Sequence, residues 1–238
     1  MTSSAALLGR VFRITFRHTV GASTVSWVKQ LMESNKSNIL SAPIEESVKA
    51  RGVTPQAIWL DSERALEKEV RRCDAIFRMI GARRGFTILD LGCGPGFALG
   101  YLEELYGSLS DRYCGVDVSE LLVEEARKIW PTHKFTVRNI VTDPLPERSF
   151  DFTAINGVLT AKYALSQDQM EAFGTSLLEA AWRSTEVAMS FNVMSPYVDW
   201  RREDLFHWPV ERAAAFCVSK LSRHRRPADR QGTRGDGR

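Results

Sequence analysis

The sequence has few cysteines, and their spacing suits neither a metal site nor a disulfide framework. Four occur in 238 residues, at positions 73, 93, 114 and 217, with no C-x-x-C pair among them. Zinc sites and disulfide-stapled scaffolds both need closely and regularly spaced cysteines. We therefore expect no metal and four reduced thiols, which indicates a cytoplasmic protein.

Long apolar runs are missing as well. No stretch reaches the roughly 18 apolar residues that a membrane span requires, so we expect no membrane association. The composition, with 44% hydrophobic and 26% charged residues, is that of an ordinary globular protein. A chain of 238 residues has room for one large α/β domain and a small extension.

Acidic residues are scarce at the two ends of the chain. Residues 1–44 carry five Lys or Arg against Glu33 alone, a net charge of +4, and residues 223–238 carry six Arg against two Asp, again +4. Residues 45–222 hold 21 basic and 26 acidic side chains, a net charge of −5. A nucleic-acid groove needs clustered cations on the folded surface, so we expect no nucleic-acid partner.

Both basic ends are expected to lie outside the folded domain. Residues 1–44 are predicted to be a poorly ordered N-terminal extension, although "LLGRVFRITFRHTV" also fits an amphipathic targeting segment. Residues 223–238 contain Ala228 as their single aliphatic residue. Such a segment cannot bury enough apolar surface to offset its ordering entropy, so it is predicted to be a disordered Arg/Gly-rich tail.

Between the ends we predict a helical cap over residues 45–84 and an α/β domain over residues 85–222. The cap contains a helix that can start at Asp61 or Ser62 and end at Gly81, with Leu66, Val70, Cys73, Phe77 and Ile80 recurring at helical spacing. Leu66, Val70 and Phe77 of this set are expected in the core. In the domain, strand candidates alternate with helix candidates, which predicts a doubly wound, mostly parallel sheet. The strands are 87–91, 112–116, 134–138, 150–155 and 187–193, and the helices 97–106, 119–129, 167–182 and 209–221.

The first strand of this domain runs into the glycine-rich stretch "ILDLGCGPG", residues 88–96. Gly92 and Gly94 permit a tight turn that a ligand can approach closely, and Gly96 lets the next helix pack against the sheet. A dinucleotide-binding turn needs a further glycine at position 97, where this chain has a phenylalanine. Asp90 would repel a pyrophosphate but attract a cation, which argues against an NAD-dependent oxidoreductase.

With these residues, "ILDLGCGPG" resembles the signature of the Rossmann-like, seven-stranded S-adenosylmethionine-dependent methyltransferases, and the resemblance extends over about residues 60 to 222. It implies S-adenosylmethionine as the cofactor. Asp117 ends the second strand of the domain, 21 residues after Gly96, where an acid can accept both ribose hydroxyls. Val118 is expected against the adenine ring. The residues expected to bind the cofactor are Asp90, Gly92, Cys93, Gly94, Gly96, Asp117, Val118, Asn139, Ile140 and Asn156.

The third strand ends in "RNIVTD", where the family usually has an acid followed by a small residue. Counting back from the "FD" that opens the fourth strand puts Asn139 at this place. An Asn carbonyl can still accept a hydrogen bond from the adenine amino group, and Asp143 is the alternative if the turn is shifted. The acid of "FD", Asp151, is expected to be structural.

The fourth strand ends in "INGVLTAKY", and the resemblance implies that Asn156, Gly157 and Val158 face the transferred methyl group. Amide methyltransferases carry N-P-P-Y here, so N-G-V-L argues against adenine-N6 or glutamine-amide methylation. Candidate acceptor contacts are Tyr163, Tyr197 and His207, and His207 is also a candidate general base. The alternative for Tyr197 and His207 is an ordinary aromatic loop that packs on the sheet.

The sequence thus indicates a methyltransferase that acts on an oxygen or nitrogen of a small-molecule acceptor. The family fold ends in a strand hairpin, and no alternating apolar segment follows the helix at 209–221. We expect this hairpin to be missing or replaced by the tail, which would leave strand 187–193 as an exposed sheet edge. A truncated or frame-shifted chain that binds the cofactor weakly, without catalysis, is therefore the alternative function.

Overall fold

The computed structural model describes residues 12–14, 38–58, 64–199 and 201–221. Its centre is a six-stranded sheet in the order β1-β6-β5-β2-β3-β4. The pairs from β6 to β4 are parallel, and β1 runs antiparallel to β6. The doubly wound, mostly parallel sheet is therefore confirmed. The strands are β1 (Phe12–Ile14), β2 (Ile88–Leu91), β3 (Tyr113–Asp117), β4 (Lys134–Val137), β5 (Phe150–Ile155) and β6 (Thr185–Phe191).

The central strands are buried on both faces. All four residues of β2 are buried, and alternate side chains belong to different cores: Ile88 lies in the core on one side, Leu89 and Leu91 in the core on the other. This period of two puts Asp90 on the same side as Ile88. Because helices cover both faces, these strands have nearly continuous apolar sequences, as parallel strands usually do.

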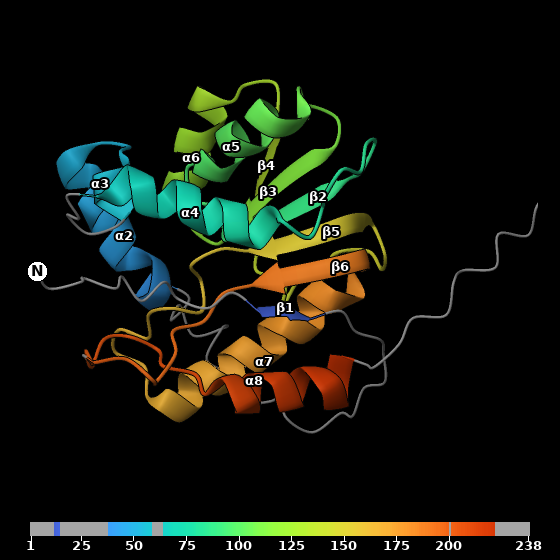
Figure 1. The fold of residues 1–238 in the computed structure, drawn as a ribbon. Coiled ribbons are helices and arrows are strands. Elements are labelled where there is room, and N and C mark those ends of the chain that lie inside the picture. The colour runs from blue at the N-terminus through green and yellow to red at the C-terminus, as the bar shows by residue number, and fades with distance from the viewer. Residues whose placement is uncertain (1–11, 15–37, 59–63, 200, 222–238) are drawn as a thin grey trace, which may run out of the picture.

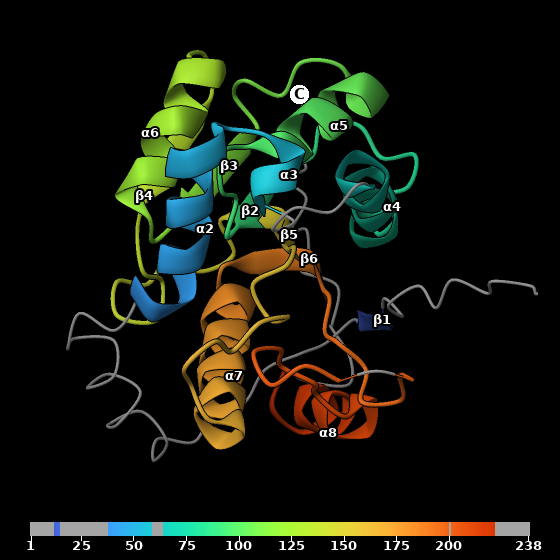
Figure 2. The same cartoon turned by 90° about the vertical axis from the view of Figure 1, so that its left-hand side faces the viewer.

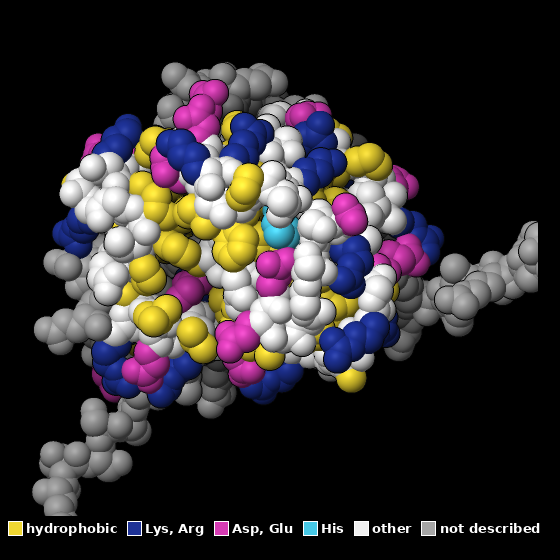
Figure 3. Space-filling model, turned by 90° about the horizontal axis from the view of Figure 1, so that it is seen from above, with side chains coloured by type: hydrophobic (Ala, Val, Ile, Leu, Met, Phe, Trp, Pro, Cys, Tyr) yellow, Lys and Arg dark blue, Asp and Glu magenta, His cyan; other side chains and the backbone are white. Residues whose placement is uncertain are grey.

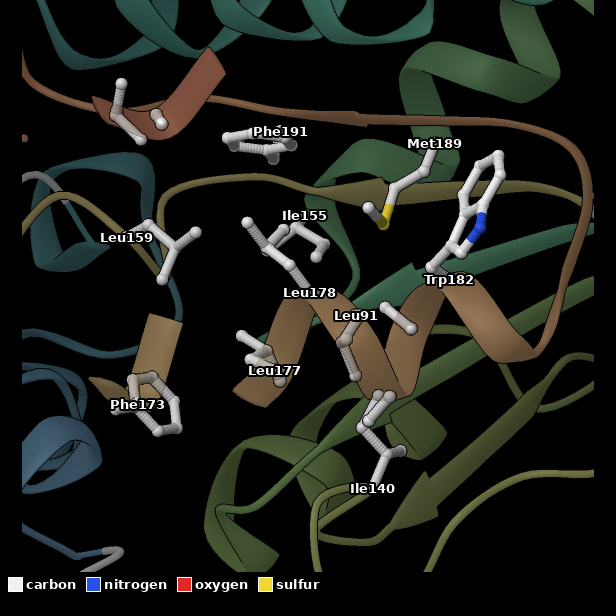
Figure 4. Packing of buried hydrophobic residues seen from close by; sticks show 14 of the residues in the cluster. Leu91, Ile140, Ile155, Leu159, Phe173, Leu177, Leu178, Trp182, Met189 and Phe191 are labelled. Carbon is white, nitrogen blue, oxygen red and sulfur yellow. The ribbon is translucent and has the colours of Figure 1, made fainter. Parts of the chain in front are cut away.

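Helices cover the two faces of the sheet in two layers (Figure 1). One layer holds α4 (Ala65–Phe77), α5 (Phe97–Tyr106) and α6 (Glu120–Ile129); the other holds α7 (Gln167–Arg183) and α8 (Val210–Phe216), which continues as the π-helical turn η1 (Cys217–Leu221). A capping box between Ser166 and Gln169 starts α7, and it satisfies two of the backbone donors that a helix start leaves free. Figure 4 shows Leu178 and Trp182 of α7 facing Ile155 and Met189 of the strands.

Two further helices, α2 (Asn38–Arg51) and α3 (Pro55–Ile58), stand at the ends to which the parallel strands point (Figures 1 and 2). A small buried cluster is formed by Val48 of α2, Ala57 of α3 and Leu122 of α6. This cluster fixes the two helices to the layer that contains α6. Together with α4, α2 and α3 cover the carboxyl ends of the central strands.

The expected core face of α4 is partly wrong. Leu66 is 63% exposed and Val70 47% exposed, whereas Phe77 is buried as expected. Cys73 and Ile80, which share the predicted spacing, are buried too, and Ala65 and Ile76 complete the buried face. Only the first two positions of the predicted stripe therefore lie off the core. The expected cap at Asp61 or Ser62 lies outside the described residues, and the helix ends at Phe77, four residues before Gly81.

The prediction that β6 forms an exposed sheet edge is also wrong. β1 pairs with it antiparallel, with Phe12 opposite Phe191 and Ile14 opposite Met189. A strand from the N-terminal segment thus occupies the edge beside the last three residues of β6. In the described part of the chain that follows β6, which ends at residue 221, no further strand forms. The predicted disordered tail and most of the predicted N-terminal extension lie outside the described residues.

Charges of both signs are mixed on the surface above α4, α5 and α6. Figure 3 shows Lys and Arg interspersed with Asp, Glu and apolar side chains on this face. Among the helices described here, none combines the length and apolar character that crossing a bilayer would need.

Candidate functional site

A cavity of about 1720 Å³ lies where the parallel strands end. Its wall is built from α2 and α4, from the turn after β2, from the residues that follow β3, β4, β5 and β6, and from the loop between β6 and α8. The carboxyl ends of the strands are where open α/β sheets bind their ligands. The cavity exceeds the roughly 300–1,000 Å³ that a single small-molecule site usually occupies.

The three glycines of the turn serve different purposes. All have positive φ angles, of 76° at Gly92, 52° at Gly94 and 83° at Gly96, which glycine adopts without strain. A Cβ on Gly92 would stand 2.1 Å from Cγ2 of Val158, and a Cβ on Gly96 would meet Trp130 at 2.9 Å. A Cβ on Gly94 would meet no atom within 4 Å. Gly94 therefore presents bare backbone to the cavity, while Gly92 and Gly96 are needed for packing.

Asp90 is buried in the wall of this cavity, with 1% of its surface exposed. The hydroxyl of Tyr113 donates a hydrogen bond to its Oδ2 at 2.7 Å. Burial raises the pKa of Asp90 to about 7; Tyr113 opposes this shift, and the nearby acids Glu69 and Asp117 add to it. The charges acting on Asp90 are thus negative, which favours a cationic ligand here.

Asp117, the last residue of β3, lies beside the glycine turn. Its Oδ2 accepts a hydrogen bond from the Gly94 amide and its Oδ1 one from the Ser119 amide, both at 2.9 Å. Burial raises its pKa, and these backbone donors oppose the shift. Each carboxylate oxygen has a further lone pair, so Asp117 can accept additional hydrogen bonds from a ligand in the cavity.

The remaining predicted cofactor residues line the same cavity. Val118, Asn139 and Ile140 are on its wall, and Asn139 accepts from the Val141 amide at 3.1 Å. The alternative to Asn139, Asp143, is off the wall and forms an ion pair with Arg138.

Asp151 has the structural role that the sequence indicated. Its Oδ2 accepts hydrogen bonds from the backbone amide and the hydroxyl of Thr87, at 2.8 and 2.9 Å. These bonds connect the beginnings of β2 and β5.

Sequence reasoning missed a polar group that α4 contributes to the cavity. Glu69 and Arg72 line it, and the Nδ2 of Asn156, after β5, donates to Oε1 of Glu69 at 3.2 Å. The Oδ1 of Asn156 is buried and has no hydrogen-bond partner among the residues that the structure describes. Arg72 packs so closely on Gly157 that a Cβ there would lie 2.8 Å from its guanidinium. The one available signal was the i, i+3 spacing of Glu69 and Arg72, which places them on one helix face.

Two of the three predicted acceptor residues line the cavity, and the third does not. Tyr163 and Tyr197 line the cavity, and Tyr197 is 67% exposed. Tyr163 has a positive φ of 45°, held by bonds from its own amide and that of Lys162 to the Asp204 carbonyl. His207 is off the cavity wall, with its Nδ1 2.9 Å from the carbonyl oxygen of Ser195. This geometry favours a structural role for His207.

Several known proteins resemble this chain over part of its length. Residues 88–181 match the family model described as a methyltransferase domain. A candidate methyltransferase of Mycobacterium tuberculosis is 27% identical over 148 residues, which are 60% of this chain and 84% of that protein. An uncharacterized 37.1 kDa protein of a Streptomyces fradiae transposon is 40% identical over 83 residues, 34% of this chain. The match spans only 24% of that protein's length.

Among solved structures, the 4+2 cyclase SpnF has a TM-score of 0.53 at 17% identity, with 87% of this chain and 73% of that chain covered. At this identity the likeness concerns the fold alone. The family match covers the glycine turn, the strands β2 to β5 and most of α7. Residues 88–181 thus match a methyltransferase domain by sequence, and the fold of the chain is Rossmann-like.

Proposed function

We propose that this chain is an S-adenosylmethionine-dependent methyltransferase that transfers the methyl group to an oxygen or nitrogen of a small-molecule acceptor. The observation that carries the proposal is the buried carboxyl of Asp90 beside the bare backbone of Gly94, with Glu69 and Asp117 as the nearby charges. S-adenosylmethionine carries a sulfonium and an ammonium against one carboxylate. A pyrophosphate would be repelled by the same field.

The polar groups of the cavity suit the amino-acid end of this cofactor. Asp90, Glu69 and the unpartnered Oδ1 of Asn156 are acceptors for an ammonium group. Arg72 is the cation among these cavity residues. It would hold the carboxylate of the cofactor, since guanidinium pairs well with carboxylates. Burial lowers the pKa of Arg72, and Glu69 and Cys73 oppose that shift, so a carboxylate would further favour its charged form.

The other end of the cofactor would lie along the predicted residues. Asp117 would accept the ribose hydroxyls, and Val118, Asn139 and Ile140 would surround the adenine. The bound cofactor supplies a methyl group that its sulfonium already activates. The residues of the chain therefore have to align the acceptor and exclude water, a role that we propose for Gly157, Val158 and Tyr163 at the cavity wall.

We assign no general base to this chain. His207 points to the Ser195 carbonyl from outside the cavity wall, and a base is needed only when the acceptor keeps a proton that it would not lose unaided. The mixed charges on the face in Figure 3 support a small acceptor over a nucleic acid. A cytoplasmic location fits the four buried free cysteines.

Calorimetry of the purified chain with S-adenosylhomocysteine and with NAD tests the proposal. We expect binding of S-adenosylhomocysteine alone, and we expect Asp117→Ala to weaken it about ten-fold or more through the loss of charge-assisted hydrogen bonds. Binding of NAD alone, or of neither ligand, would overturn the assignment. A screen of metabolite pools with methyl-labelled donor would then identify the acceptor and separate an active enzyme from a non-catalytic cofactor binder.

A further inference from the structure

The two carboxylate oxygens of Asp90 have different surroundings. Oδ2 accepts the hydrogen bond from Tyr113, and both side chains are almost completely buried, with 1% of Asp90 and 2% of Tyr113 exposed. Oδ1 accepts no hydrogen bond from the residues that the structure describes. Since Asp90 is part of the cavity wall, Oδ1 is the oxygen left for a ligand.

The register of the sheet explains how Tyr113 reaches Asp90. Ile88 pairs with Tyr113, and Asp90 pairs with Gly115, so Tyr113 lies two residues before Gly115 on the same face. The ring of Tyr113 is packed against Phe135, at 5.6 Å between centroids, and against His133, at 6.3 Å. A ring packed in this way holds its hydroxyl at one place, and the hydrogen bond then fixes the rotation of the Asp90 carboxyl.

The groups that face Asp90 are acids and thiols. Glu69 comes from α4 and Asp117 from the end of β3. The thiols Cys73, Cys93 and Cys114 also interact with Asp90, and burial raises the pKa of each, so they stay neutral. With two carboxylates nearby and its own burial, Asp90 has a pKa of about 7 and holds a proton for much of the time near neutral pH.

We propose that Tyr113 is a positioning residue for the cofactor: it orients Asp90 toward the ammonium group of the cofactor, and binding of that ammonium releases the proton of Asp90 to solvent. Tyr113 keeps its own proton and remains the donor to Oδ2. The inference rests on the proposed function, because it requires a cofactor with an ammonium group. Beyond the proposed function, it assigns a role to Tyr113 and predicts that cofactor binding is coupled to the release of one proton.

The wild-type chain gives the first test, by titration calorimetry with S-adenosylhomocysteine between pH 5 and pH 8.5. In two buffers of different ionisation enthalpy, we expect release of about 0.9 proton per ligand at pH 6, because most Asp90 is protonated there before binding. The affinity should fall about ten-fold for each pH unit below 6, since only the ionised fraction of Asp90 binds the ammonium.

Two variants and a control then separate the roles. Tyr113→Phe removes the donor to the ionised carboxyl, so the midpoint of the pH profile should rise by about one unit and the affinity at pH 7 should fall about five-fold. Asp90→Asn should give a flat profile. Tyr106→Phe is the matched control, because its hydroxyl bonds the Gly81 carbonyl at 2.9 Å, away from the cavity wall, and its profile should equal that of the wild type.

Each outcome decides one question. If S-adenosylhomocysteine binds without proton release, the inference is wrong while the proposed function stands. If the wild-type profile titrates but Tyr113→Phe leaves its midpoint unchanged, Tyr113 does not position Asp90. If the wild-type chain binds no S-adenosylhomocysteine at any pH, the proposed function itself fails.

Discussion

At the scale of single residues, the site combines positions that packing requires with positions that only a ligand would require. Gly92 and Gly96 would clash with Val158 and Trp130 if they carried a Cβ. Gly94 has free space beside it and a φ of only 52°. Glycine is thus required for two different reasons within five residues: packing at Gly92 and Gly96, and access of a ligand at Gly94. Substitutions can distinguish the two reasons.

Alanine at Gly92 and at Gly94 should therefore have different effects. Gly92→Ala forces a Cβ to 2.1 Å from Val158 and strains the backbone, so we expect a loss of about 2–5 kcal/mol in the free energy of unfolding. Gly94→Ala should lose only about 1 kcal/mol but weaken S-adenosylhomocysteine binding about ten-fold or more, because the new methyl occupies space at the cavity. Urea unfolding and calorimetry measure the two quantities.

Gly107→Ala is the control for backbone strain. Gly107 caps α5 with a φ of 74°, and a Cβ there would meet nothing within 4 Å. Its stability loss should resemble that of Gly94→Ala, while its affinity for S-adenosylhomocysteine should stay that of the wild type. Equal affinities in these two variants would show that the turn is not part of the ligand surface.

At the scale of elements, the sheet and the helices that follow its strands could be predicted closely. Parallel strands that are buried on both faces and amphipathic helices both leave strong patterns in the sequence. The predicted helix at 167–182 became α7, Gln167–Arg183. The face of α4 could not be predicted in the same way. Near the start of α4 the buried side depends on Ala65, a small residue that indicates a core less clearly than Leu66 and Val70 do, although both of these are exposed.

The polar side of α4 illustrates a second limit. In a sequence, Glu69 and Arg72 look like an ordinary solvated i, i+3 pair. Only the tertiary arrangement brings them to the cavity, where Glu69 accepts a hydrogen bond from Asn156, 87 residues further along the chain. The pairing of β1 with β6 has the same character, since a three-residue strand carries no periodicity from which its partner could be inferred.

The orientation of α4 makes a stability prediction. Phe77→Ala should cost about 3–5 kcal/mol in the free energy of unfolding, because the ring is 2% exposed in the core on the α5 side. Leu66→Ala should change it by less than about 0.5 kcal/mol, since Leu66 is 63% exposed. Both values follow from urea unfolding monitored by circular dichroism. A large loss for Leu66→Ala would mean that this face of α4 is covered in solution.

At the scale of the whole molecule, the site lowers the stability of the fold that carries it. The folded chain buries Asp90, whose pKa rises to about 7 from an ordinary value of 3.8, and it buries Asp117, whose pKa is also raised. Between about pH 4 and pH 7, Asp90 keeps a proton in the folded chain that it has lost in the unfolded chain. The destabilisation is therefore absent below about pH 4, grows as the pH rises, and is complete above about pH 7.

Asp90→Asn should consequently stabilise the empty protein while it weakens cofactor binding. Above pH 7 the gain in the free energy of unfolding is at most about 4 kcal/mol, from the difference between the two pKa values, and it should shrink toward zero near pH 4. Urea unfolding of both proteins between pH 4 and pH 8 measures the difference, in which the titration of groups that do not interact with Asp90 cancels. The exposed Asp74 of α4, paired with Arg78 at 2.7 Å, gives the matched control: Asp74→Asn should change stability by less than about 1 kcal/mol at any pH. A gain for Asp90→Asn that stays constant with pH would mean that Asp90 does not change its charge in this range, and the electrostatic basis of the cation site would have to be given up.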